Sequence, residues 1–444
     1  MNKTVQKIRI AIHIGVEPGT AGGTAQSTQG LVRSLGELEG PEEFILVAQT
    51  REQAEWIERY RGPNQKLVIK PRFWRPARTN GLQNGRGLAD RIRSVLRPPV
   101  RATRWLMTQL NPPPETVRIS DGYYESLDCD VLHFPTQAFI VCAVPTIYNP
   151  HDLQHLHYPQ FFTPEELAWR EVVYRNACQF AHTVVVGSEW IKKDVLRQYN
   201  ARPDKVQVIP WAPPTEQYAQ VSPGQVEKTA QEMGLPATFA FYPAVTWPHK
   251  NHVRLLEAIA NLRDRRGLIV NLVCSGSKGA AWPKIGRRID ELKLTSQVRF
   301  LGFVSETDLR ALYRSAQFVV LPSLFEADSC PIYEAWSEGT AVASSNHTAL
   351  PDQVGDAGLL FDAGDVTAIE QALERMATDP LLRRYLIERG HQRVKDFNWN
   401  RTARAFRAVY RRAAALTLND EDRWLLSWDW MKEPNKAPSL DVLQ

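Results

Sequence analysis

The chain has 444 residues, of which 43% are hydrophobic and 23% charged, and its formal net charge is +5 at pH 7. This composition is that of a globular protein, and the length is sufficient for two domains with complete cores. No run approaches the roughly 18 consecutive apolar residues of a membrane span. Residues 1–7 lead directly into a predicted strand rather than into a signal segment.

The five cysteines are scattered along the chain, and no two of them form a Cys-x-x-Cys pair. An odd number without such pairs favours neither a disulfide framework nor a thiolate zinc site, so we expect reduced thiols. With no signal or membrane segment predicted, we expect a cytoplasmic protein.

The first half of the chain alternates predicted strands with helical or loop segments. The first strand, Lys7–Gly15, ends at a glycine-rich loop, Gly19–Thr24, and a helical pattern follows. Further strands are predicted at Phe44–Val47, Lys66–Ile69, Val131–Phe134, Val144–Tyr148, Thr183–Val186 and Val206–Ile209. This alternation is typical of a doubly wound α/β domain.

A proline-rich stretch, Pro210–Pro214, continues neither a strand nor a helix and predicts a hinge. Beyond it the alternation restarts and closes with a long helix from about residue 400 to 416. The strands predicted there are Phe239–Tyr242, Ile269–Cys274, Val298–Leu301, Phe318–Leu321 and Ala341–Ala343. We therefore predict domains at residues 1–212 and 213–416. The tryptophan-rich tail, 417–444, is expected to pack back on the first domain.

Two carboxylates with seven residues between them carry the clearest functional signal. Glu326 follows the apolar strand Phe318–Leu321, and Glu334 lies just past Pro331, a residue suited to the first turn of a helix. The carboxyl ends of parallel strands are where such sheets bind ligands, and helix N-termini attract phosphate. Hydroxyls near the carboxylates and phosphate on the amides indicate a nucleotide sugar. The alternative is two solvated glutamates.

The residues around this pair, together with Ala335–Ser344, Ala349–Gly358 and Asp365, resemble the retaining glycosyltransferases of the family 4 type with their E-x7-E motif. The resemblance covers most of residues 140–412; residues 1–140 match only at the first strand and the glycine loop. It implies the GT-B fold, in which two Rossmann-like, doubly wound domains face each other across a cleft. It also implies a nucleotide-diphosphate sugar as co-substrate, with no catalytic metal and no further cofactor.

The resemblance assigns a donor phosphate site to the loop after the second domain's first strand. Lys250 matches the family's phosphate-binding lysine, and we include its neighbour Asn251 in the donor site. Many members carry an arginine several residues earlier, but positions 240–249 contain none. Arg254 is a possible substitute, although one turn into a helix it could be simply exposed.

Two further loops of the first domain complete the expected cleft. Gly22 and Gly23 allow close approach of backbone to the diphosphate or acceptor, although no Walker lysine follows them and a ligand-free tight turn is the alternative. His151, in a His-Asp-Leu signature of the family, is expected to face the donor sugar. His151, His155 and His157 could instead suggest a metal, but no H-E-x-x-H occurs and Pro159 limits any aligning helix.

The segment after the first carboxylate departs from the family pattern of glycines and an aromatic residue. Here it reads Ala327-Asp328-Ser329, which would alter the sugar pocket. By analogy Glu326 binds sugar hydroxyls and Glu334 the ribose. The donor phosphate is expected on the backbone amides around the helix start, which comprises Ser329, Cys330 and Pro331.

Residues 70–105 are the most basic part of the chain. Ten basic residues stand against one acid between Lys70 and Arg104, and Phe73 and Trp74 lie among them. Such a mixture suits a peripheral contact with anionic lipid at the inner face of a membrane, and nucleic acid less well. A solvated loop is the alternative.

The sequence thus predicts a retaining glycosyltransferase that moves a sugar to a glycan or lipid-linked acceptor in surface polysaccharide or glycolipid assembly. Two other classes stay open. One is a GT-B epimerase or phosphorylase. The other is a non-catalytic partner subunit, which the missing arginine and the altered segment 327–329 favour.

Overall fold

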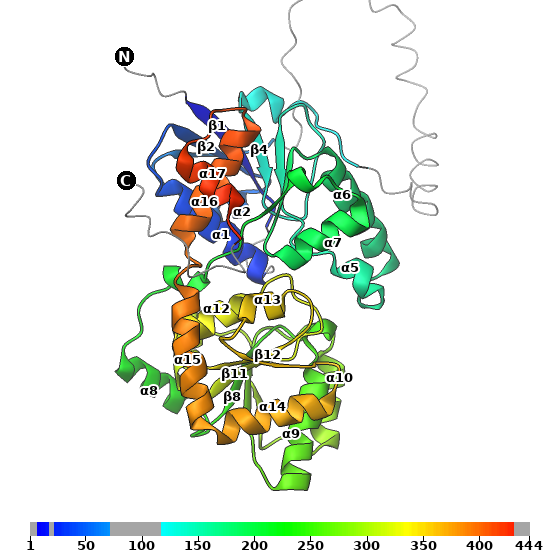
Figure 1. The fold of residues 1–444 in the computed structure, drawn as a ribbon, viewed down its shortest axis with the longest axis vertical. Coiled ribbons are helices and arrows are strands. Elements are labelled where there is room, and N and C mark those ends of the chain that lie inside the picture. Colours follow the sequence, from blue (N-terminus) through cyan, green and yellow to red (C-terminus); the bar gives the residue numbers. More distant parts are fainter. Residues whose placement is uncertain (1–6, 17–21, 72–116, 430–444) are drawn as a thin grey trace, which may run out of the picture.

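The computed structural model describes residues 7–16, 22–71 and 117–429. Two sheets, each built of parallel strands, form the centres of two domains (Figure 1). The first has the order β3-β2-β1-β4-β5-β6-β7 and the second the order β10-β9-β8-β11-β12-β13. In each sheet the order reverses at the strand that comes first in the chain, which defines a doubly wound sheet. The expected α/β class with two such domains is confirmed.

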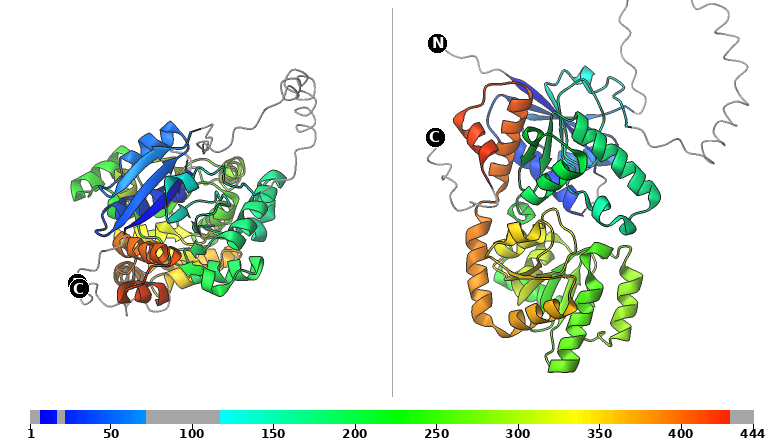
Figure 2. Two further views of the ribbon diagram at one scale, coloured as in Figure 1. Left: turned by 90° about the horizontal axis from the view of Figure 1, so that it is seen from above. Right: turned by 45° about the vertical axis from the view of Figure 1, so that its right-hand side comes forward.

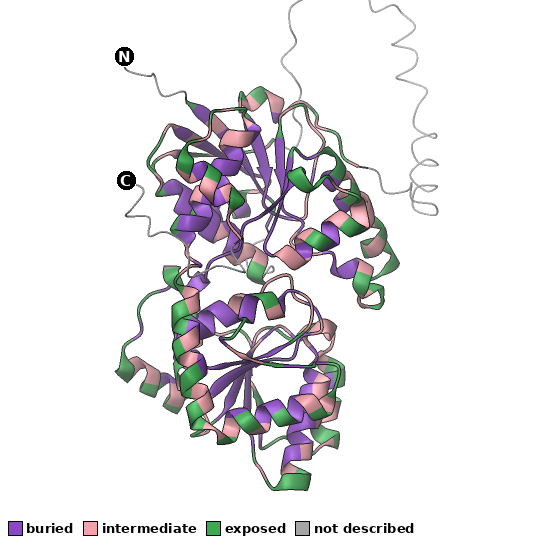
Figure 3. Cartoon of the chain, in the orientation of Figure 1, coloured by how far each residue is buried: buried purple, intermediate pink, exposed green. Residues whose placement is uncertain are grey.

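The strands are short apolar runs covered on both faces, as parallel strands require. The first sheet holds β1 (Ile8–Ile14), β2 (Glu42–Ala48), β3 (Gln65–Ile69), β4 (Val131–Phe134), β5 (Thr146–Tyr148), β6 (Thr183–Val186) and β7 (Val206–Val208). The second holds β8 (Ala240–Pro243), β9 (Leu272–Ser275), β10 (Val298–Phe300), β11 (Phe318–Leu321), β12 (Val342–Ser345) and β13 (Leu359–Phe361). Figure 3 shows both sheets as the buried centre of their domain.

Several helices begin where a polar side chain caps the free amides of the first turn. Thr163 forms a capping box with Glu166 before α6, and Ser188 accepts from the Ile191 N–H at the start of α7. The helices of the first domain are α1 (Gly22–Gly36), α2 (Arg51–Glu58), α5 (Gln154–His157), α6 (Pro164–Phe180) and α7 (Glu189–Tyr199). Short 3-10 turns join several elements; they are η1 (Glu125–Leu127), η2 (Pro159–Phe161), η3 (Pro203–Lys205) and η4 (Pro214–Gln217).

In the second domain a helix follows each strand. The helices are α8 (Pro223–Glu232), α9 (His252–Arg266), α10 (Trp282–Glu291), α11 (Glu306–Ser315), α12 (Cys330–Ser337), α13 (Leu350–Val354), α14 (Val366–Thr378) and α15 (Pro380–Val394). Of these, α8 precedes the first strand and α15 follows α14. A 3-10 turn, η5 (Pro248–Lys250), precedes α9. Among the described residues, no helix combines the length and apolar character that a membrane crossing requires.

The chain returns to the first domain earlier than the sequence indicates. We predicted that the second domain extends to residue 416, but α16 (Trp399–Ala413) packs on α1 and contributes Phe406 and Tyr410 to the first domain's core. The contact is close, since a Cβ on Gly30 would lie 2.1 Å from the Trp399 ring. Figures 1 and 2 show α15 along the second domain and α16 continuing on the first. A domain boundary at 416 is therefore wrong.

The tail continues this return, because α17 (Asp420–Ser427) packs against α16. Leu425 is buried in the same core, and Trp424 and Trp428 stack with ring centroids 5.3 Å apart. Residues 430–444 lie outside the described part of the chain.

Candidate functional site

A lysine and a glutamate that lie 76 positions apart meet at the carboxyl edge of the second sheet. Lys250 Nζ donates to Glu326 Oε1 at 2.6 Å, and the two side chains are 21% and 12% exposed. Thr348, which follows β12, holds the backbone of Glu326 from both sides. Its Oγ1 donates to the Glu326 carbonyl at 2.8 Å and accepts from the Glu326 N–H at 3.0 Å. The structure therefore brings together two residues that we predicted for one site.

The loop that carries Lys250 is fixed by Asn251. This residue has a left-handed backbone, with φ at 59°, and its side-chain amide donates to the carbonyls of Pro322 at 3.0 Å and Ala363 at 2.8 Å. Asn251 therefore ties together the loops that follow β8, β11 and β13, and its N–H groups are engaged by the protein itself. Its Oδ1 accepts from Arg254 at 3.0 Å, which places a second cation beside this loop.

The two histidines that flank Lys250 do not add to its charge. Burial, with the nearby Lys250 charge as the next cause, lowers the pKa of His249 to about 2 and that of His252 to about 3. Both rings are therefore neutral at pH 7. The positive charge of the loop is carried by Lys250 and, one turn later, by Arg254.

The start of α12 offers fewer free amides than the sequence suggests. The Ser329 N–H donates to Gln353 Oε1 at 2.8 Å, and Gln353 returns a hydrogen bond to the Ser329 carbonyl at 2.9 Å. Pro331 has no N–H, and the N–H of Ile332 donates back to Ser329. Within the described residues no group accepts the N–H of Cys330. Of Ser329, Cys330 and Pro331, Cys330 is thus the residue whose amide can meet a phosphate oxygen.

Glu334 lies on α12 and is buried, with 4% of its surface exposed. Its Oε2 accepts from the Tyr313 hydroxyl of α11 at 2.5 Å. Burial raises the pKa of Glu334 to about 7, and the hydrogen bond from Tyr313 opposes this shift. Tyr313 was not among the predicted site residues, because nothing in the helical pattern of α11 distinguishes it from an ordinary core position.

His151 lies in the first domain, beside the hinge. Its backbone is left-handed, with φ at 63°, its Nε2 donates to the Pro135 carbonyl at 2.9 Å, and its ring stacks on Trp211 with centroids 5.9 Å apart. Burial lowers the pKa of this imidazole, so it is neutral at pH 7 with Nδ1 as an acceptor.

The other two histidines of this region have separate partners. His157 bonds to Asp194 at 2.7 Å, and His155 lies 3.7 Å from Glu171. In the part of the chain that the structure describes, no three His, Cys, Asp or Glu side chains are grouped as metal ligands.

The described part of the predicted glycine loop is the start of a helix. Gly22 and Gly23 form the first turn of α1, and a Cβ placed on Gly23 would meet no atom of the described residues within 4 Å. Residues 17–21 of the predicted loop lie outside the described residues. Toward the described residues, the backbone at Gly23 is therefore open.

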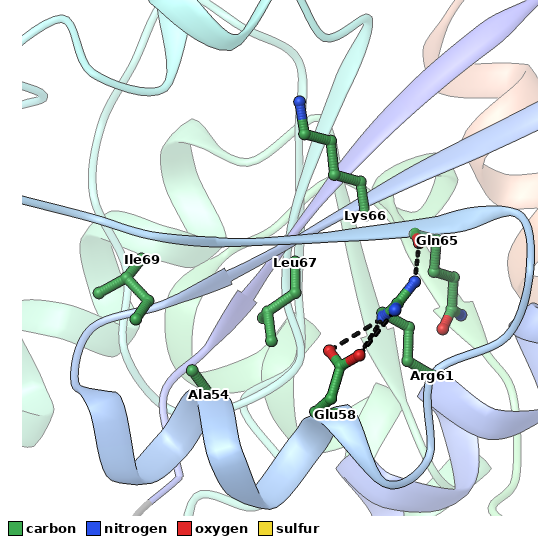
Figure 4. Close-up of a pocket in the computed structure, with 7 residues that line it drawn as sticks. All are labelled: Ala54, Glu58, Arg61, Gln65, Lys66, Leu67 and Ile69. Carbon is green, nitrogen blue, oxygen red and sulfur yellow. Dashed lines mark hydrogen bonds and ion pairs between the residues drawn. The ribbon is translucent and has the colours of Figure 1, made fainter.

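A surface hollow of about 470 Å³ lies elsewhere, beside the edge strand β3 (Figure 4). Its Arg61 donates to Glu58 at 2.9 Å and to the Gln65 carbonyl at 2.8 Å, so the cation is already paired. None of the predicted donor-site residues lines this hollow, and it is not the candidate site.

Two family models match the chain. The model described as Glycosyltransferase Family 4 matches residues 76–217, and the one described as Glycosyl transferases group 1 matches residues 228–393. The chain belongs to the family 4 type of glycosyltransferases. The second match contains Lys250, Glu326 and Glu334, and the first contains His151.

Relatives with assigned names are similar over part of their length. O-antigen chain mannosyltransferase B of Escherichia coli is 28% identical over 250 residues, which are 56% of this chain and 65% of that protein. A D-inositol 3-phosphate glycosyltransferase of Corynebacterium glutamicum (strain R) is 29% identical over 285 residues, which are 61% of this chain and 68% of that protein. The chain therefore spans just under two thirds of the first relative and just over two thirds of the second.

Solved glycosyltransferase structures share the fold over nearly the whole chain. Anabaena Alr3699/HepE in complex with UDP and glucose has a TM-score of 0.64 at 16% identity and covers 90% of this chain and 99% of its own. WaaG, a glycosyltransferase involved in lipopolysaccharide biosynthesis, has a TM-score of 0.60 at 14% identity and covers 92% and 100%. The expected GT-B architecture is thereby confirmed.

Proposed function

We propose that this glycosyltransferase moves a hexose, with retention of configuration, from a nucleotide-diphosphate sugar to a glycan or lipid-linked acceptor. The observation that carries the proposal is the Lys250–Glu326 pair at the carboxyl edge of the second sheet. A cation for phosphate and a carboxylate for hydroxyls are thus adjacent in one place. The neighbour crystallised with UDP and glucose and the relatives named as mannosyl- and inositol-phosphate glycosyltransferases support a sugar nucleotide of this kind.

The pair is suited to hold the donor because the charges of Lys250 and Glu326 already neutralise each other before the donor binds. Removing either partner of a half-buried ion pair leaves a charge that is costly to keep away from water. A bound donor supplies a new partner for each group, with phosphate oxygens for Lys250 and sugar hydroxyls for Glu326. Glu334 would accept from the ribose hydroxyls, and His151 from a sugar hydroxyl across the cleft.

The transfer would be a same-face displacement. The bond between the sugar C1 and the leaving diphosphate oxygen breaks, and the acceptor oxygen bonds to C1 on that same face. The acceptor's proton passes to a diphosphate oxygen, so no side chain has to take it. Charge builds on the leaving diphosphate, where Lys250 and the Cys330 amide stabilise it.

The experiment that tests this function combines a donor screen with product analysis. A nucleotide sugar present at about 100 times its dissociation constant is expected to stabilise the protein by about 2.7 kcal/mol in a thermal-shift screen. The donor so found is then offered with acceptors, and the anomeric configuration of the product is read by NMR. An inverted product contradicts retention. Donor binding without transfer favours the non-catalytic partner, and turnover without an acceptor favours the epimerase or phosphorylase.

Metal removal provides an independent prediction. We expect transfer to keep its rate in excess EDTA, because Lys250 and the Cys330 amide can hold the charge that a divalent ion would otherwise neutralise. The measurement is the initial rate before and after dialysis against EDTA. A complete loss of activity that Mg²⁺ or Mn²⁺ restores would overturn the metal-free mechanism.

Contact with an anionic membrane stays a proposal for residues 70–105. Residues 72–116 lie outside the described part, and Lys70 pairs with Asp121 at 2.9 Å. Each arginine near an anionic surface contributes up to about 1 kcal/mol, an effect that salt screens. We expect liposomes with anionic lipid to sediment the protein at low salt, and replacement of Arg91, Arg93, Arg97 and Arg101 by Ser to abolish this. Equal sedimentation of both proteins contradicts the proposal.

A further inference from the structure

Phe325 belongs to the second domain by sequence but to the first domain by packing. It follows β11, directly before Glu326, and is only 2% exposed. Its ring lies among first-domain aromatic side chains, with centroids 5.4 Å from His157, 5.6 Å from Trp190 and 6.1 Å from Tyr158. It is part of the same hydrophobic cluster as the core of β6 and β7. The side chain is therefore an anchor that crosses from one domain to the other.

The backbone on either side of this ring is also held by the first domain. The Tyr158 hydroxyl donates to the Leu324 carbonyl at 3.2 Å, and Ser188 Oγ donates to the Ala327 carbonyl at 2.8 Å. Ser188 is itself fixed, because the same oxygen accepts from the first turn of α7. The loop is thus bonded to the first domain one residue before Phe325 and two residues after it.

Asp328 extends this contact by one more residue. It lies so close to Gly187 that a Cβ there would be 3.0 Å from Asp328 Oδ2. Glu326 lies between the two residues of this loop that the first domain binds, but it contacts its own domain, through Lys250 and Thr348. The carboxylate that we assign to the sugar is therefore held between two domains, whereas Lys250 and Glu334 lie wholly in the second.

We propose that Phe325 is a positioning residue whose docking into the first domain sets the place of Glu326, so that the sugar site is complete only when the two domains are closed on each other. The inference rests on the proposed function for the role of Glu326, but the docking itself does not. The contacts that Lys250, the Cys330 amide and Glu334 make with the nucleotide come from the second domain, so nucleotide binding should not require the anchor. Positioning of the sugar, and therefore transfer, should require it.

The test is a set of matched variants assayed for nucleotide affinity, KM and kcat. We expect Phe325→Ala to bind the nucleoside diphosphate with a dissociation constant within about two-fold of the wild type, while kcat falls by about 100-fold, the size of effect that a displacement of about 1 Å can produce. Phe325→Leu should recover part of the rate. Phe180→Ala, which removes an aromatic ring that is 52% exposed at the end of α6, serves as the control and should change neither quantity.

Coupling across the domains distinguishes docking from a general loss of packing. Trp190→Ala should lower kcat to a similar degree, and the double variant should be hardly slower than either single one, because both changes remove the same contact. Gly187→Ala keeps both cores filled and places a Cβ 3.0 Å from Asp328 Oδ2, so it presses on the loop only by a few tenths of an ångström and should lower kcat less than Phe325→Ala does. A fall in nucleotide affinity as large as the fall in kcat, or fully multiplicative effects of the two ring deletions, would overturn the inference.

A readout without catalysis separates this inference from the proposed function. Small-angle scattering should give a larger radius of gyration for Phe325→Ala than for the wild type and Phe180→Ala. If no donor supports transfer but the radius increases as expected, the proposed function fails and the docking stands. An unchanged radius in Phe325→Ala contradicts the docking whatever the activity.

Discussion

Replacing Lys250 with Ala is expected to lower kcat by about 100-fold while changing nucleotide affinity much less. The reason is that the diphosphate gains charge as the glycosidic bond breaks, so its cation contributes more in the transition state than in the ground state. The ribose contacts of Glu334 exist in both states, so Glu334→Ala should weaken nucleotide binding instead. Initial rates at saturating donor, with dissociation constants from calorimetry, separate the two effects.

The control for this prediction is Lys284→Ala, which removes an exposed lysine on α10 of the same domain. It should keep the wild-type rate and affinity. Lys250→Ala also leaves Glu326, whose side chain is 12% exposed, without its partner at 2.6 Å. Lys250→Arg restores a cation for Glu326 and should recover part of kcat. A wild-type kcat in Lys250→Ala would show that the phosphate site lies elsewhere.

The sequence predicts the site to the extent that the site follows from the positions of the strands along the chain. Glu326 and Lys250 each lie in the loop that follows a buried strand, and because β8 and β11 are neighbours in the sheet, these loops meet at one edge. The period of apolar residues is a local property, so strands and their carboxyl ends can be read from it. The pattern therefore places both residues at the carboxyl ends of strands, whereas their contact depends on the pairing of β8 with β11, which the structure shows and the apolar period does not.

What the sequence does not reveal depends on side chains from distant segments. Gln353, 24 residues away, accepts the N–H of Ser329, and the Phe325 side chain packs in the core of the other domain. Neither residue belongs to a sequence motif, and no local pattern indicates which residues they contact. The same reason explains the misplaced domain boundary, because the apolar pattern of α16 does not say which domain it covers; the structure shows Trp399 packed on Gly30 of α1.

A buried ion-pair network holds the donor-site helix α12 to the linker between the domains. Glu338, at the end of α12, accepts from Arg310 Nε at 2.7 Å and from Arg314 Nε at 2.5 Å, and its side chain is fully buried. The two arginines also donate to linker carbonyls, Arg310 to Ala219 at 2.8 Å and Arg314 to Val221 at 2.6 Å. The Glu338 carboxylate therefore compensates both arginines, which connect α11 and α12 to the linker between the domains.

Glu338→Ala is accordingly expected to reduce the free energy of unfolding by roughly 3–5 kcal/mol, because it leaves Arg310, whose side chain is 6% exposed, as an uncompensated buried charge. Urea denaturation measures the change. The matched control is Glu232→Ala, which removes the carboxylate of a pair at 3.7 Å whose side chains are both 63% exposed and should cost about 1 kcal/mol or less. If both variants lose the same small amount, the arginines are compensated by the linker carbonyls alone, and Glu338 does not hold α12 in place.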